Sequence, residues 1–98
     1  MPKFKADWMW QTSLKQLFDA RGQTHLRVRS HHDLLIVESG PEADAVAHVR
    51  FRRQGVHLWA LELPSHTGRW DKTPFRGLME PMIDILEHEI PWTLAPLD

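Results

Sequence analysis

The residues with the clearest chemical potential alternate along three stretches of strand character. In the first two stretches arginine or histidine occupies every second position, and the last stretch adds His57 and, two residues on, Trp59. Such alternation places side chains on one face of a β-sheet. Guanidinium groups contact phosphates and an exposed ring stacks a base, which is what binding of single-stranded nucleic acid requires. We therefore predict a binding face made of Arg27, Arg29, His48, Arg50, Arg52, His57 and Trp59.

Two other interpretations of this face stay open. It can be an ordinary solvated surface, on which Arg50 lies over Trp59 as a cross-strand cation–π pair worth roughly 0.5–1 kcal/mol. It can also be a dimer interface, because arginine and tryptophan are enriched at interfaces. The chain has a net charge of −1, whereas nucleic-acid-binding domains are usually basic. Our leading hypothesis is thus a non-enzymatic binding or interaction module of unknown partner, with single-stranded nucleic-acid binding as the alternative.

The seven histidines are a second candidate site. His31-His32-Asp33 could supply metal ligands, with His25 or His66 as a third. Adjacent histidines point apart, however, and neither an H-x₃-H nor an HExxH spacing occurs. The chain contains no cysteine, so thiolate ligands and disulfides are excluded. We predict no bound metal.

The polar stretch over residues 65–72 holds Ser65, His66 and Asp71 close together in sequence. A catalytic triad requires these groups to converge in space beside an oxyanion site. No nucleophile-elbow glycines flank Ser65. We predict neither a catalytic residue nor a cofactor, and treat an anion site formed by Arg69 and Lys72 near a helix start as a minor alternative.

The hairpin over residues 45–64 determines which side chains share a face. A two-residue turn at Gln54-Gly55 would pair Arg50 with Trp59 and Phe51 with Leu58. One face would then carry Ala47, Val49, Phe51, Leu58 and Ala60, and the other His48, Arg50, Arg52, His57, Trp59 and Leu61. A slip of one residue would invert the second strand, so this assignment depends on the turn type.

The rest of the chain predicts two helices and two further strands. A helical stripe begins at Ser13, or otherwise near Asp7, and ends at Arg21-Gly22. Strands are predicted over residues 24–30 and 33–38, a polar loop over 65–72, a helix cap at Thr73-Pro74, and a helix over 78–89. The predicted fold class is α+β: a four-stranded antiparallel meander flanked by an N-terminal and a C-terminal helix, in the order α-β-β-β-β-α.

Composition indicates one globular domain over residues 1–98, with 42% hydrophobic and 26% charged residues. The longest purely apolar run, residues 34–37, is too short to span a membrane, so we expect a cytoplasmic protein with no membrane contact. Charge is uneven, because residues 21–76 are basic and residues 77–98 carry five acids and no base. That asymmetry indicates either compensation within the chain or two surfaces of opposite sign. Five tryptophans exceed what one small core hides, which favours a homodimer or a protein partner.

Overall fold

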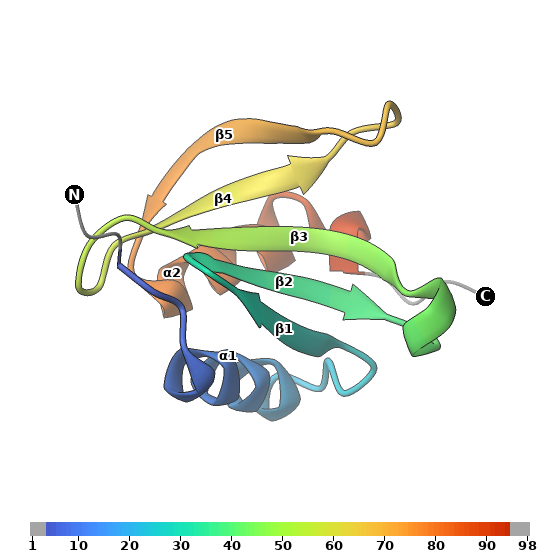
Figure 1. Cartoon of the computed structure of the whole chain (residues 1–98), viewed down its shortest axis with the longest axis horizontal. Coiled ribbons are helices and arrows are strands. Elements are labelled where there is room, and N and C mark those ends of the chain that lie inside the picture. Colours follow the sequence, from blue (N-terminus) through green and yellow to red (C-terminus); the bar gives the residue numbers. More distant parts are fainter. Residues whose placement is uncertain (1–3, 95–98) are drawn as a thin grey trace.

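The structure is a computed structural model that describes residues 4–94 and combines two α-helices with a five-stranded sheet (Figure 1). In chain order the elements are α1 (Trp8–Ala20), β1 (Arg27–His31), β2 (Leu34–Ser39), the 3₁₀ helix η1 (Glu42–Asp44), β3 (Val46–Arg53), β4 (Trp59–Pro64), β5 (Trp70–Gly77), α2 (Met79–His88) and the 3₁₀ helix η2 (Pro91–Leu94). No helix among these residues has the length and hydropathy needed to cross a membrane.

The strands form an antiparallel meander in the order β1-β2-β3-β4-β5. Both α-helices pack on one face of it, where Leu14 and Phe18 of α1 join Ile83 and Leu86 of α2 in a single buried cluster with Phe51. Figure 1 shows α2 passing behind β3. The predicted α+β class and its flanking helices are confirmed, but the sheet has five strands rather than four.

We call the opposite side of the sheet the open face, because no element of residues 4–94 covers it. The strand register places alternate side chains there. They are Arg27, Arg29, Leu34, Ile36, Glu38, Arg50, Arg52, Ala60, Glu62, Trp70, Lys72 and Arg76.

The fifth strand corrects the prediction for residues 70–77. Trp70, predicted to lie in a polar loop, begins β5, and the helix cap predicted at Thr73-Pro74 is wrong. A proline inside a strand argues against a central position, but β5 is an edge strand that pairs only with β4. The pairing also shifts between Ala60 and Glu62, and this bulge accommodates Pro74.

The β3–β4 hairpin corrects the predicted register. Arg53 pairs with Trp59 and Arg50 with Glu62, so the connection is a five-residue loop over 54–58. The backbone N–H groups of Gln54 and Gly55 both donate to the carbonyl of Leu58, which closes this longer loop. The pairing is displaced by three residues from the predicted one, and an odd displacement turns every side chain of β4 to the other face.

The two helices lie close to their predicted positions. The Asp7 side chain accepts a hydrogen bond from the Met9 N–H at 3.2 Å, so α1 starts at the earlier of its two predicted starts. Arg21 follows α1 and contacts α2 through Asp84 Oδ1 at 2.6 Å and through Glu87 Oε1. Hydrogen bonds to Glu87 and Asp84 raise the pKa of Arg21. Part of the acidic surface of α2 is therefore compensated within the chain.

Candidate functional site

The open face brings four of the seven predicted site residues together. Arg27, Arg29, Arg50 and Arg52 lie on it, from β1 and β3, with side chains between 16% and 55% exposed. The other three, His48, His57 and Trp59, lie elsewhere. The predicted seven-residue face is therefore reduced to its arginines.

Trp59 lies in the core rather than on the binding face. Only 1% of its surface is exposed, and its ring makes edge contacts with Trp10 and Phe51 at centroid distances of 5.5 and 6.5 Å. The inverted register of β4 is the cause. His57 lies in the exposed β3–β4 loop, with its ring 5.8 Å from Trp10. Neither side chain can contribute to a ligand on the open face.

His48 lies at a bulge between β2 and β3 and points to the helix side of the sheet. Its Nε2 is 2.6 Å from the Ser39 hydroxyl and its Nδ1 is 2.7 Å from the backbone carbonyl of Thr93 in η2. A histidine hydrogen-bonded to a serine can activate the serine hydroxyl as a nucleophile. Both side chains are buried, however, and the third partner is a peptide carbonyl rather than a carboxylate. This pair instead attaches η2 to the sheet.

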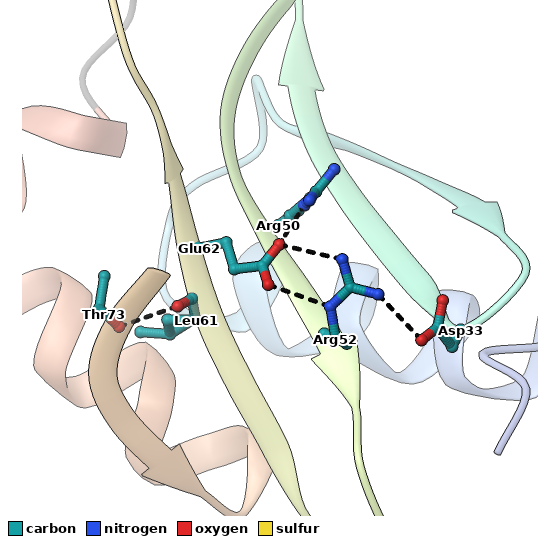
Figure 2. A network of polar contacts seen from close by, with 6 residues as sticks. All are labelled: Asp33, Arg50, Arg52, Leu61, Glu62 and Thr73. Carbon is teal, nitrogen blue, oxygen red and sulfur yellow. Dashed lines mark hydrogen bonds and ion pairs between the residues drawn. The ribbon is translucent and has the colours of Figure 1, made fainter. Parts of the chain in front are cut away.

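The centre of the open face is a buried carboxylate, Glu62, held by two arginines (Figure 2). Arg50 Nε donates to Glu62 Oε1, and Arg52 Nε donates to Oε2 at 3.0 Å. Arg52 Nη1 also donates to Asp33 Oδ2 at 3.1 Å. The Glu62 side chain is 3% exposed, so its charge is satisfied almost entirely by protein groups.

The ionisation of Glu62 reflects two opposing effects. Burial alone would raise the pKa of its carboxyl, because the charged form loses its hydration. Hydrogen bonds from Arg52 and Arg50, together with their positive charges, outweigh burial and lower the pKa below its usual value. Glu62 is therefore ionised at neutral pH and carries a structural ion-pair network.

A second carboxylate, Glu38, lies between the arginines of β1. Arg29 Nε and Arg27 Nη2 are 3.4 and 3.7 Å from Glu38 Oε1. The Glu38 side chain is 12% exposed, against 37% for Arg27 and 55% for Arg29. The two carboxylates are thus less exposed than the arginine side chains that contact them, although Arg27 Nη2 is itself buried.

The arginine stems also cover apolar residues of β2. In the register, Ile36 lies between Arg29 and Arg50, while Leu34 pairs with Arg52. Both apolar side chains are buried on a face that no helix covers. Long arginine stems shield apolar surface in this way while their charged heads stay near water. These arginines therefore also contribute to the stability of the sheet.

Trp70 belongs to the open face and was missed by the sequence prediction. The Arg50 guanidinium lies over its ring, 4.5 Å from the centroid. The cation–π partner of Arg50 is thus Trp70 of β5 rather than the predicted Trp59. Trp70 and Lys72 are two residues apart and lie on the same face of the sheet. This period-two spacing was the sequence signal by which Trp70 could have been assigned to the open face.

The other sequence candidates are not assembled into sites. The His31 and His32 rings are exposed at the β1–β2 turn, with centroids 4.3 Å apart. Within the described part of the chain, no group of three or more potential ligands could hold a metal ion. The Ser65 hydroxyl bonds Thr67 Oγ1 at 2.8 Å and so takes part in a local turn.

Across residues 4–94, the strand side chains of the open face carry six cations against the carboxylates of Glu38 and Glu62, and Asp33 in the turn before β2 adds a third carboxylate beside Arg52. The cations are Arg27, Arg29, Arg50, Arg52, Lys72 and Arg76. A surface with this excess of positive charge attracts anions. Comparisons with protein-family models, curated proteins and solved structures return no match for this chain. The chemistry of this face is therefore the basis for the function proposed below.

Proposed function

We propose that the protein is a non-enzymatic binding module that holds an anionic partner on its open face. The observation that carries this proposal is the difference in exposure between the two kinds of charge, with the carboxylates of Glu38 and Glu62 buried and the arginine and lysine side chains of the face more exposed. A partner that approaches this face meets positive charge first. The excess of positive charge lies at the end of the open face near Lys72 and Arg76. At the opposite end, the exposed carboxylate of Glu42 in η1 lies near Arg29 and offsets its charge.

Single-stranded nucleic acid is the partner class that this chemistry favours. The strand backbone supplies regularly spaced phosphates for the cations. The Arg50–Trp70 stack supplies flat surfaces of the kind on which unpaired bases stack, worth about 1–3 kcal/mol for each base. The face is a broad sheet surface rather than a deep cavity, which suits an extended chain.

A homodimer is a second proposal, and it concerns the helix side of the molecule. A cleft of about 480 Å³ between α1 and α2 is lined by Trp10, Leu17 and Leu78, and Leu78 is 58% exposed. Trp8 at the start of α1 is 70% exposed. Exposed apolar groups of this size favour association. Light scattering at increasing concentration tests the dimer, and a monomer mass at the highest concentration would rule it out.

The nucleic-acid proposal predicts salt-dependent binding through the open face. Fluorescence anisotropy of a labelled mixed-sequence single strand, titrated with protein at 50 and 200 mM salt, measures it. We expect affinity to fall as salt rises, because phosphate contacts release counterions. Arg29→Glu should weaken binding further, roughly tenfold at 50 mM salt, since it replaces an attractive charge by a repulsive one.

Lys5→Glu is the matched control, because it makes the same change of charge at an exposed residue outside the sheet. Arg29 is 55% exposed but lies 3.4 Å from Glu38, so the melting temperature of the variant is measured beside its binding, and only a folded variant is compared with the wild type. Equal weakening by both variants would assign the effect to net charge alone. Absence of binding at 50 mM salt would reject the nucleic-acid proposal.

A further inference from the structure

A small hollow on the open face lies between β3, β4 and β5. Its volume is about 50 Å³. Ala60 and Leu61 of β4 line it, Leu61 with its side chain turned into the core, and Gln54 lies at one side. The charged groups around it are Arg52, Glu62, Lys72 and Arg76. Three cations and one carboxylate therefore surround a space of molecular size.

The irregular pairing of β4 with β5 creates this hollow. Ala60 pairs with Arg76 and Glu62 with Lys72, so three residues of β5 lie opposite Leu61 alone. The Thr73 hydroxyl donates to the Leu61 carbonyl at 2.8 Å, which anchors the extra residues. Lys72 and Arg76 are four residues apart in β5 and so lie on the same face, and the bulge sets them opposite Glu62 and Ala60, which are only two residues apart in β4. The small side chain of Ala60 leaves the space between them open. The proline and threonine that obscured β5 in the sequence thus shape the hollow.

Most polar groups around the hollow already have partners. Glu62 accepts hydrogen bonds from Arg50 and Arg52, and the Thr73 hydroxyl is bonded to Leu61. Lys72 and Arg76 differ, because neither forms an ion pair with any carboxylate among residues 4–94. Lys72 is the register partner of Glu62, yet Glu62 is turned toward the arginines of β3. Lys72 and Arg76 therefore have no ion-pair partner among residues 4–94, although they lie beside Glu62, whose charge is already balanced by Arg50 and Arg52.

We propose that this hollow is a phosphate-binding site in which Lys72 and Arg76 hold one phosphate group. About 10–15 Å³ of such volume accommodates one water molecule, so about 50 Å³ is room for the oxygens of one tetrahedral oxyanion. Arginine binds phosphate through its planar fork, and lysine does so as a point charge. This inference rests on the proposed function, since the phosphate would be a phosphodiester of the bound strand; free inorganic phosphate is the other source with the same chemistry.

The test uses two kinds of variant in the single-strand titration. Lys72→Gln with Arg76→Gln removes the two charges, and Ala60→Leu fills the hollow without changing any charge. We expect both to weaken binding roughly tenfold at 50 mM salt. We expect the double variant to reduce the slope of log affinity against log salt by about 0.7, the contribution of one phosphate on a single strand. The control is Lys5→Gln with Lys15→Gln, which makes the same charge change outside the open face and should keep the wild-type slope.

The outcomes separate this site from the proposed function. If Arg29→Glu weakens binding but the hollow variants bind like the wild type, the phosphate site is overturned and the proposed function stands. If the wild type binds no strand, inorganic phosphate is titrated into ¹⁵N-labelled protein. Saturating shifts at Lys72 and Arg76, absent with chloride at equal ionic strength, would support the site with free phosphate as ligand; no shift would overturn it. Should Ala60→Leu lower the melting temperature, the two surface glutamine substitutions decide the result.

Discussion

Replacement of Trp59 by alanine is expected to lower the free energy of unfolding by about 3–5 kcal/mol, the cost typical of deleting a large aromatic side chain from a core. Trp59 is 1% exposed and makes edge contacts with Trp10 and Phe51. The substitution leaves a cavity that the neighbouring strands and α1 can fill only in part. Urea denaturation followed by circular dichroism measures the change.

Trp92→Ala is the matched control for this experiment. Trp92 is 70% exposed, so its loss should change stability by no more than about 0.5 kcal/mol. The comparison tests the register of β4, because the two-residue turn expected from the sequence would place Trp59 on the open face. Equal effects of the two substitutions would contradict the position of Trp59 described above.

Glu62→Ala is expected to destabilise the protein by about 3–5 kcal/mol, although Glu62 is a polar residue on a face that no helix covers. Arg50 and Arg52 would lose the carboxylate that both of them contact, and Arg50 is only 16% exposed. Removal of one member of a buried ion pair is costly, because the remaining charge lacks a partner and full hydration. Urea denaturation measures this effect as well.

Glu80→Ala provides the contrast. Glu80 is 65% exposed and lies 3.8 Å from Arg21, so its ion pair should contribute well under 1 kcal/mol. A second contrast is the double variant Glu62→Leu with Arg50→Met. It should recover part of the loss caused by Glu62→Ala, because it removes both charges and retains apolar volume. If Glu62→Ala lowers the free energy of unfolding by no more than Glu80→Ala does, the ion-pair network around Glu62 has no structural role.

The pH dependence of stability provides another test of the same residue. The pKa of Glu62 is lowered in the folded protein, so the folded state favours its ionised form. The contribution of Glu62 to the free energy of unfolding is therefore fully present above the pKa of a glutamate in the unfolded chain, about 4.3. It is lost as the pH falls through the lower pKa of Glu62 in the folded protein. The unfolding free energy of the wild type should fall more steeply below about pH 4 than that of Glu62→Gln. Parallel profiles would contradict this.

Much of the fold follows from local pattern. The periodic stripes of both helices, the acceptor at Asp7 and the stop at Gly22 define α1 and α2 to within a few residues. The alternation of Arg27, Val28 and Arg29 likewise defines β1 and its two faces. These signals involve neighbours in the chain, so no knowledge of tertiary structure is needed to interpret them.

The errors have a common physical origin in pairing between strands. Gln54-Gly55 has the composition of a tight turn, but the chain forms a longer loop that buries Trp59. Thr73-Pro74 has the composition of a helix cap, but Pro74 lies in β5, where it is tolerated because β5 is at the edge of the sheet. The partners of Arg50 depend on both register and edge strand, so neither Glu62 nor Trp70 could be assigned to it from sequence.

The structure places only four of the seven residues of the predicted binding face on one surface. The arginines of β1 and β3 share the open face, as their alternation indicates. Their role is double, since they cover Leu34 and Ile36 and balance buried carboxylates. Lys72 and Arg76 form no such ion pairs among residues 4–94, and both lie on β5, the strand that was not predicted from the sequence. The part of the site most available to a ligand was therefore hidden with β5.

The most direct test of the open face as a binding surface is a titration of ¹⁵N-labelled protein with a short single-stranded oligonucleotide, followed by two-dimensional NMR. The indole N–H of Trp70 and the backbone amides of Arg29 and Lys72 should shift as the strand is added. The indole signals of Trp10 and Trp92, which lie on the helix side, should stay in place. Shifts confined to α1, α2 and η2, or no shift at low salt, would contradict the account.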